Sequence, residues 1–559
     1  MRGADEVEIY SLGGCGGFGM NATLFVAGDE GVLVDFGLGL PKSPALGVNQ
    51  IVPDPGPLLA RCPRLAAVLL THAHDDHVGA LAYLPPAWRS APIYGPGLAI
   101  DAAKDRFGDA AVPPPPLHTV APGVRLDLGR FAATLIHVTH SVPETRVVAL
   151  DTPAGLVVHL SDFKLDPTPV QGPPSDLSAL AALGQRGVRL VLFDSTGALR
   201  EGRTASERSV VGPLESVIRE SSGQVVVSTF ASHLHRIQSL CGIAARSGRQ
   251  PVPMGLRMTR TLRHGIDRGL FDAPAGLLRD RDELPQIPER RRLVIAGGCQ
   301  GERDSSLNRI SLDNEPRLTL GHGDLVVISA SIIPGCEVNV GRMADRFLRR
   351  GVSVVHAAEL RDLHVSGHAG REELREVLAL LRPEAAVPIH GDRTHLEAAA
   401  RLAEQLDEPP RQVEVIERGD GIRLGARGLV RGERVDLPPR YLDEAGRRIP
   451  GEILKDRFRM SETGAATIFA SIRRGAGGAI DAEVRMAALG VPGWDDPADR
   501  RVRALEEEAR ALVLRLGSRP GSGERVKDGI ASLVGHALHE GSRRKPKVVV
   551  VLDDPRGRA

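Results

Sequence analysis

Residues 71–81 concentrate side chains that bind metal ions. They read THAHDDHVGAL and directly follow the apolar run LAAVLL, which predicts a buried strand. Alternate residues of an extended chain point the same way, so His72 and His74 can bind one metal ion. Asp76 and His77, after the turn, can bind a second ion beside it. Imidazole and carboxylate ligands together suit zinc, with manganese as the alternative.

A two-metal site needs more ligands than this motif supplies, and the sequence offers them after other apolar runs. His140 follows TLIHVT, Asp162 comes shortly after VVHL, and His390 follows AAVPI. Taken singly, each is most often a cap or a solvated turn residue. Their shared place at strand ends favours ligand roles, and a carboxylate such as Asp162 can bridge two cations. His137 and His159 lie inside apolar runs and are interpreted as core histidines.

The elements that must position these residues belong to an ordinary globular protein. Hydrophobic residues make up 42% and charged residues 25% of 559, which argues against a disordered or collagen-like chain. The net charge of +1 does not indicate a nucleic-acid partner by itself. Five scattered cysteines imply neither a disulfide framework nor a cysteine zinc site. An acidic N-terminus and the lack of long apolar runs predict a cytoplasmic protein with no membrane partner.

Apolar runs alternate with helical patterns, which predicts the α/β class. Strands are expected at 65–70, 155–160, 188–193, 224–229, 292–297, 324–329, 352–357 and 548–552. Helices are expected at 371–382 and 499–517, where apolar residues recur on one face. The stretch from 426 to 450 is charged and broken by proline and glycine, so it is predicted to be a linker.

The motifs taken together resemble a known family. The HxHxDH pattern with the later histidines and aspartate is similar to the metallo-β-lactamase fold of metal hydrolases. FDSTGA, HVSGHAG and VPIHGD narrow the resemblance to the β-CASP nucleases, and within them to ribonuclease J. The resemblance implies an α/β protein: a metallo-β-lactamase αββα sandwich with an inserted β-CASP α/β domain and a small α/β C-terminal domain. The implied boundaries are 1–205 and 356–425 for the two parts of the sandwich, 206–355 for the β-CASP domain, 426–450 for the linker and 451–559 for the C-terminal domain.

The resemblance also implies an activity. It indicates a metal-dependent ribonuclease that hydrolyses RNA phosphodiesters by a hydroxide held between two metal ions, both from the 5′ end and internally, in RNA processing and decay. The partners are single-stranded RNA and, through the C-terminal domain, a homodimer or homotetramer. Asp194 and His368 occupy the family's acid–base positions. Two Zn²⁺ per chain, with Mn²⁺ as the alternative, would be held by His72, His74, Asp76, His77, His140, Asp162 and His390.

Two further segments are predicted to bind substrate. A hydroxyl and backbone N–H groups around a Ser-Gly turn can bind a phosphate, and the resemblance implies that these segments contact the RNA backbone and a 5′-monophosphate. His233 stands where the family usually has asparagine, and its protonation would strengthen a monophosphate preference below about pH 6.5. The candidate substrate-binding residues are Ser232, His233, His235, His364, Val365, Ser366, Gly367 and His368.

Departures from the family pattern leave alternatives open. The glycine motif reads GGCGGFGMN without the usual glutamate, and a PGNE motif reads PGCE at 334–337. A phosphodiesterase acting on DNA or another phosphoester is therefore the alternative to a ribonuclease. A catalytically idle RNA-binding protein is opposed by the retained ligands. Arg257, Arg260 and Arg263 recur every three residues and either contact phosphates or form a solvated helix face.

Overall fold

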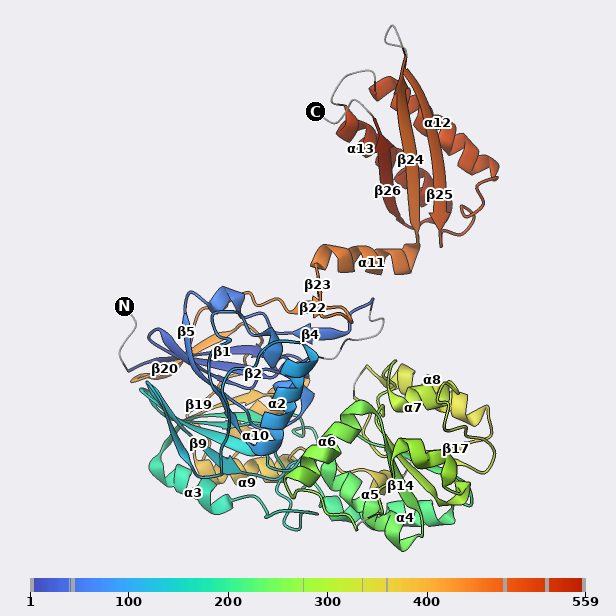
Figure 1. Cartoon of the computed structure of the whole chain (residues 1–559). Helices are drawn as coiled ribbons and strands as arrows, with labels where there is room; N and C mark the ends of the chain where they lie inside the picture. The colour runs from blue at the N-terminus through green and yellow to red at the C-terminus, as the bar shows by residue number, and fades with distance from the viewer. Residues whose placement is uncertain are drawn as a thin grey trace. The chain divides into compact units, whose positions relative to one another are not determined.

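The computed structural model of the chain describes residues 5–39, 41, 46–274, 276–333, 335–357, 360–475, 480–517 and 522–554. Pro334 of the PGCE motif lies outside these residues. The chain divides into two compact units, Met1–Ala45 with Asn49–Gly446 and Leu46–Val48 with Arg447–Ala559 (Figure 1). Among the helices in the described part of the chain, none has the length and apolar character needed to cross a membrane.

Two large sheets form the centre of the first unit. In spatial order, the first contains β21 (Gly428–Arg431), β20 (Gly421–Gly425), β1 (Val7–Gly13), β2 (Ala22–Ala27), β3 (Glu30–Val34), β5 (Arg64–Leu69), β6 (Ile93–Gly95) and β7 (Leu117–Thr119). The second contains β19 (Gln412–Val413), β18 (Ala385–Ile389), β12 (Val188–Asp194), β11 (Gly155–Leu160), β10 (Arg146–Thr152), β9 (Phe131–His137) and β8 (Arg125–Leu128).

The side chains of these strands alternate between an inner and an outer core. In β2, Phe25 lies in the core shared by the two sheets, whereas Leu24 and Val26 lie in the outer core. In β12, Leu190 points inward and Phe193 outward. Side chains that alternate with a period of two are what a sheet buried on both faces requires. The order of the layers is helix, sheet, sheet and helix, as expected. The covering helices are α2 (Gly97–Asp109) on the first sheet and α3 (Leu177–Arg186), α9 (Arg371–Leu381) and α10 (Arg393–Glu404) on the second.

A third sheet in the first unit is entirely parallel. Its spatial order is β14 (Gln250–Met254), β15 (Arg292–Ala296), β13 (Val225–Ser228), β16 (Leu325–Ile328) and β17 (Ser353–His356). Because both faces are buried, its strands are continuous apolar runs, and such runs can be recognised in a sequence. The packed helices are α4 (Val211–Glu220), α5 (Leu234–Arg246), α6 (Leu256–Asp267), α7 (Ser306–Ser311) and α8 (Glu337–Leu348).

The stretch 426–450 differs from the linker that its charge predicts. β21 pairs with β20 and extends the first sheet, and β22 (Arg440–Leu442) pairs antiparallel with β4 (Gln50–Val52). Leu437 and Leu442 are buried in the outer core of the first sheet. A few apolar residues therefore anchor a segment whose average composition is polar.

The second unit is a small α/β structure. Its sheet has the order β25 (Ile480–Leu489), β24 (Ala465–Arg474) and β26 (Lys547–Asp553). Ile468 of β24 packs into one core with α12 (Arg500–Leu516) and α13 (Gly523–Ser542). The other side of the strands exposes Phe469, Val549 and Val551. The second unit also contains the helix α11 (Gly451–Thr463) and the short strand β23 (Arg448–Ile449). The first unit also contains six short 3-10 helices among its described residues: η1 (Gly56–Leu58), η2 (Leu81–Tyr83), η3 (Glu207–Val210), η4 (Arg281–Gln286), η5 (Glu289–Arg291) and η6 (Arg361–Leu363).

Candidate metal centre

Three neighbouring parallel strands bring candidate ligands to one edge of the second sheet. β11, β12 and β18 lie side by side and run in the same direction. Asp162 comes shortly after β11, Asp194 ends β12, and His390 follows β18. The carboxyl ends of parallel strands meet at one edge, so these side chains converge. His390 has a φ of 57°, a left-handed conformation that is rare outside glycine and is found at functional sites.

The first sheet supplies the HxHxDH motif to the same place. His72 and His74 lie between the end of β5 and the start of α1 (Asp75–Val78). Asp76 and His77 lie on α1, whose first turn carries the two aspartates. The loop after β9 contributes His140. All seven predicted ligands therefore meet in one cluster.

One group of donors faces Oδ2 of Asp162. His72 Nε2 and His140 Nε2 each lie 3.6 Å from this oxygen. His74 Nδ1 lies 3.0 Å from His72 Nε2 and 3.2 Å from His140 Nε2. Three imidazole nitrogens and one carboxylate oxygen make four donors of the kind that zinc binds.

A second group of donors faces Oδ1 of Asp162. His77 Nε2 lies 3.4 Å from this oxygen, and His390 Nδ1 lies 2.6 Å from it. His390 Nε2 is 3.3 Å from Asp76 Oδ2, which closes the group. Within each group the ligand atoms lie within 4.8 Å of one another. Because Asp162 offers one oxygen to each group, the donor set fits divalent metal ions on both sides of this carboxylate.

The charges of the cluster divide its histidines into two kinds. Burial lowers the pKa of His72 well below its usual range, so its imidazole is neutral and has a free lone pair. Burial also opposes a charge on His77, but Asp162 and Asp76 outweigh it and raise the pKa of His77 to about 10. The same two carboxylates raise the pKa of His390 well above its usual range. Protons therefore balance the carboxylates here, and they are released when a cation takes their place.

Asp35 and Thr71, which were not predicted from the sequence, hold two of the ligands in position. Asp35 Oδ2 accepts hydrogen bonds from His77 Nδ1 at 2.8 Å and from Thr71 Oγ1 at 2.7 Å. Thr71 Oγ1 is also 2.9 Å from His72 Nδ1. Contacts of this kind fix the orientation of a ligating ring. Asp35 directly follows β3, so the strand-end pattern that located Asp162 could have found it.

The predicted acid–base pair lies at the edge of the cluster. His368 Nδ1 is 2.7 Å from Asp194 Oδ2, and Asp194 is fully buried. His368 Nε2 points the other way and lies 4.0 Å from Asp162 Oδ2. Arg200 donates to the backbone oxygen of His368 at 2.6 Å. The ring is therefore held at one nitrogen, and the other faces the cluster, where a proton can be exchanged with a substrate.

The turn before His368 helps to orient the cluster. Ser366 Oγ accepts a hydrogen bond from His368 N at 3.1 Å. Gly367 O lies 2.6 Å from His140 Nδ1. A Cβ at Gly367 would lie 2.6 Å from His140 Cε1, so only glycine fits at this position.

Three histidines of the predicted substrate segments have lowered pKa values: His233 and His235, which are buried, and His364, which is half-buried. His233 accepts a hydrogen bond from Arg236 N at 3.3 Å, and burial together with the Arg236 guanidinium lowers its pKa well below the usual range. Burial lowers the pKa of His235 to about 4 and that of His364 to about 3. The expectation that His233 gains a proton near pH 6.5 is therefore wrong. Ser232 and Val365, the other candidates in these segments, are half-buried.

Two arginines of the predicted stripe on α6 are engaged in ion pairs. Arg257 Nη1 lies 2.7 Å from Asp75 Oδ2, and Arg260 Nη1 lies 2.7 Å from Asp109 Oδ1. Their partners lie on α1 and at the end of α2. These two guanidiniums therefore fasten α6 to the sandwich, whereas Arg263 has the exposed position that a solvated helix face predicts.

Comparisons with known proteins match this architecture segment by segment. Residues 15–160 match the metallo-beta-lactamase superfamily, and residues 222–347 match the beta-CASP domain of ribonuclease J. Residues 353–414 match a Zn-dependent metallo-hydrolase RNA specificity domain, and residues 452–554 match the ribonuclease J C-terminal domain.

Curated relatives align along most of the chain. Ribonuclease J of Thermus thermophilus is 34% identical, over 98% of this chain and 95% of its own. Ribonuclease J of Synechocystis is 33% identical over 84% of this chain and 73% of its own. A solved protein of unknown function from Enterococcus faecalis has a TM-score of 0.51 at 16% identity and covers 75% of this chain and 100% of its own. That last likeness shows the fold alone.

Proposed function

Because the chain belongs to the ribonuclease J family and is a metal-dependent ribonuclease, we propose that its histidine–aspartate cluster holds two divalent ions, Zn²⁺ or Mn²⁺, per chain. The observation that carries this proposal is the placement of one Asp162 oxygen toward each donor group. His72, His74 and His140 hold one ion, and Asp76, His77 and His390 hold the other. When bound, such a pair of ions activates water and neutralises charge on the phosphodiester.

The chain's own residues supply the proton and the alignment. His368 holds a proton at Nε2 and delivers it to the leaving 3′-oxygen of the RNA, while Asp194 keeps the ring in this orientation through Nδ1. Half-buried Arg200, through its bond to the His368 backbone, limits movement of the turn. The reaction products are a 5′-phosphate and a 3′-hydroxyl.

The substrate segments select the strand and its end. Ser366 and Ser232 offer hydroxyl groups, and Ser366 and Gly367 offer backbone N–H groups, to a 5′-monophosphate or a backbone phosphate. His233, His235 and His364 shape this region without adding charge. Cleavage proceeds in the 5′-to-3′ direction from a monophosphate end and also internally on single-stranded RNA.

The test combines metal content with a substrate panel. Protein purified without chelator should carry about two ions per chain and should cut 5′-labelled RNA, with activity lost to a chelator and restored by Zn²⁺ or Mn²⁺. The matching DNA and a thioester should resist. One ion per chain would contradict the dinuclear site, and equal rates on DNA would favour the alternative, a phosphodiesterase without RNA preference.

The proposal also includes the domain boundaries, the oligomeric assembly and the cellular compartment of the protein. The parallel sheet supports an inserted domain at 206–355. The apolar side of the β24–β26 pair supports a homodimer or homotetramer through the C-terminal domain. All five cysteines are free thiols, which suits the reducing cytoplasm.

A further inference from the structure

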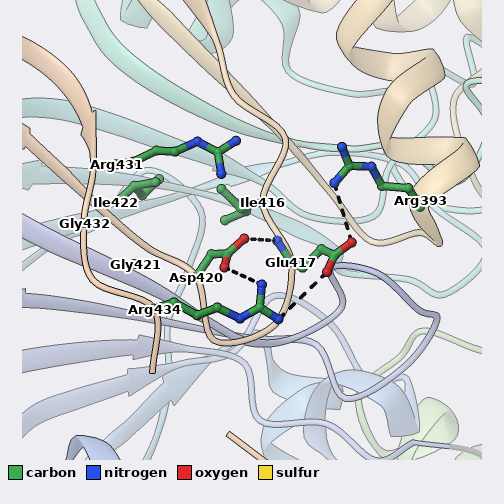
Figure 2. A pocket seen from close by; sticks show the side chains of 9 residues that line it. All are labelled: Arg393, Ile416, Glu417, Asp420, Gly421, Ile422, Arg431, Gly432 and Arg434. Carbon is green, nitrogen blue, oxygen red and sulfur yellow. Dashed lines mark hydrogen bonds and ion pairs between the residues drawn. The ribbon is translucent and has the colours of Figure 1, made fainter. Parts of the chain in front are cut away.

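A polar cavity of about 390 Å³ lies in the first unit, between the start of α10 and the strands β20 and β21 (Figure 2). Its walls carry three arginines, Arg393, Arg431 and Arg434, and two carboxylates, Glu417 and Asp420. Two isoleucines form its apolar part. None of these charged side chains belongs to the metal cluster or to the predicted substrate segments.

The two carboxylates of the cavity have different tasks. Asp420 Oδ2 accepts from the Glu417 backbone N–H at 2.9 Å, and its Oδ1 accepts from Arg434 Nη1 at 2.9 Å, so both of its oxygens are committed. Glu417 is held loosely: its oxygens lie 3.5 Å from Arg393 Nη1 and 3.9 Å from Arg434 Nη2. Its side chain is 40% exposed. The Glu417 carboxylate therefore retains acceptor positions for a ligand.

Arg431 and Arg434 retain guanidinium N–H groups that can donate to a ligand. Arg431 donates through Nε to Glu414 at 2.9 Å and through Nη2 to Val415 O at 3.0 Å, which leaves Nη1. Arg434 is engaged mainly through Nη1, and its side chain is 63% exposed. A guanidinium carries five N–H donors, so both groups can still bind phosphate oxygens. Donors from arginine beside a carboxylate acceptor complement a ribose phosphate, whose hydroxyl donates and whose phosphate accepts.

A short glycine loop connects this cavity to the metal cluster. Gly16 N donates to Gly391 O at 3.0 Å, and a Cβ at Gly16 would lie 3.6 Å from Glu417 Cγ. At the other end of the loop, a Cβ at Gly19 would lie 3.8 Å from the Asp76 Cβ. Three residues span at most about 10 Å. With the contacts at its two ends added, the path from Glu417 to Asp76 is at most about 17 Å, which is roughly five nucleotide rises of a stacked strand.

We propose that the cavity is a ribose-phosphate subsite of the ribonuclease, in which Glu417 accepts a hydrogen bond from a 2′-hydroxyl and Arg431 and Arg434 bind the neighbouring phosphate. This inference rests on the proposed function. The bound unit is a nucleotide of the RNA strand close to the cut or a released ribonucleotide, which share this chemistry. A 2′-hydroxyl contact distinguishes RNA from DNA, so the subsite contributes to the choice of substrate.

The test scans a short RNA with single 2′-deoxy substitutions, using full-length protein loaded with metal. In the wild type, one position within about five nucleotides of the cut should raise KM several-fold when its hydroxyl is removed. In Glu417→Ala, removing the hydroxyl at that position should no longer raise KM. Arg434→Gln should raise KM for every RNA and reduce the slope of log affinity against log salt by about 0.7. The matched control is Arg219→Gln, which removes an arginine that is 53% exposed and paired with Glu215.

A second arm addresses the released product. A nucleoside 5′-monophosphate should inhibit the wild type several-fold more strongly than its 2′-deoxy form, and Glu417→Ala should remove this difference. Support comes from either arm. The inference is overturned if neither arm separates Glu417→Ala from the wild type, or if Glu417→Ala has lost metal. Wild-type protein that does not cut RNA, or that holds fewer than two ions, contradicts the proposed function instead.

Discussion

At the scale of single residues, Asp35 connects the two halves of the ligand set without being a predicted ligand itself. One of its oxygens holds His77 directly, and through Thr71 it also reaches His72. Asp35→Asn keeps the size of the side chain but removes the charge that holds the His77 N–H. We expect metal affinity to fall about 10- to 100-fold, the usual effect of losing such a partner.

Competition with a chelator of known affinity measures this loss. Asp151→Asn is the control, since Asp151 is a partly exposed carboxylate on β10 that pairs with Arg125 and Arg186. Unchanged metal affinity in Asp35→Asn would show that the geometry of the ligands does not depend on this carboxylate.

His368 separates chemistry from metal binding. His368→Ala removes the group proposed to deliver the proton but none of the proposed ligands, so kcat should fall by ~10²–10⁴-fold while both ions stay bound. Single-turnover rates and elemental analysis of the same sample measure the two effects. His536→Ala, at an exposed histidine of α13, should change neither. Loss of metal from His368→Ala would instead make His368 a ligand.

Two histidines of the proposed substrate segments, His235 and His364, bear on the pH response. The pKa of His235 is lowered to about 4 and that of His364 to about 3, so neither gains a proton between pH 8 and pH 6. These histidines should therefore add no pH dependence of their own to the ratio of rates on 5′-monophosphate and 5′-triphosphate RNA, although the monophosphate itself has a second pKa of about 6. Measuring both RNAs at pH 6 and pH 8 tests this. A change in the ratio larger than the ionisation of the 5′-phosphates accounts for would mean that one of these histidines is protonated in the RNA complex.

At the scale of elements, an ion-pair ladder joins α2 of the sandwich to α6 beside the parallel sheet. Aspartates recur every four residues on α2 and meet basic residues in reverse order on α6, as two antiparallel helices require. His264 Nε2 lies 2.9 Å from Asp105, and Arg260 lies 2.7 Å from Asp109. Arg268 pairs with Asp101. Each surface pair contributes only about 0.2–1 kcal/mol, but the three act together.

The charge swap tests this ladder. Arg260→Asp should increase hydrogen exchange in α6, because two carboxylates then face each other. Combining it with Asp109→Arg should restore most of the protection, with a coupling of about 0.5–1 kcal/mol. Hydrogen exchange read by peptide is the measurement, since it isolates α6 from the rest of a large chain. Full protection in Arg260→Asp alone would mean that apolar packing holds α6 without the ladder.

Most of the strands were predictable because they are buried on both faces. The run expected at 65–70 differs from β5 by one residue at each end, and the run at 188–193 differs from β12 by one residue at its end. The strands β21 and β22 were hidden in a charged stretch. β21 forms a tight hairpin with the adjacent β20, which lies before the stretch, and β22 is stabilised by the distant strand β4. Local composition carries no information about such partners.

The predictability of the site follows the same division between local and long-range information. Residue type and position after an apolar run are enough to identify His72, Asp162 and His390 as candidate ligands. The sequence could not show that Asp162 directs one oxygen to each group, nor that Arg236 and burial keep His233 neutral. The first property depends on distances between segments far apart in the chain, and the second on how the folded chain buries the His233 ring.

At the scale of the whole molecule, the second unit has its own core and an open sheet face. Its helices cover one side of β24 and β26. On the other side Phe469 and Val551 lie opposite each other in the ladder, exposed by 44% and 47%, and Val549 is exposed by 43%. Contiguous apolar side chains on a regular sheet are typical of a surface that is covered by another protein chain.

Substituting this face tests the proposed assembly. The wild type should sediment as a dimer or tetramer, and Phe469→Lys with Val551→Lys should sediment as a single chain, because two charges would be buried without partners. Metal content and the rate per site on a short RNA should not change, since the metal cluster belongs to the first unit. The matched control is Leu312→Lys, a 45% exposed leucine of the first unit, which should leave the sedimentation unchanged. A wild type that is monomeric at micromolar concentration, or a double variant that still assembles, would rule out this face as the interface.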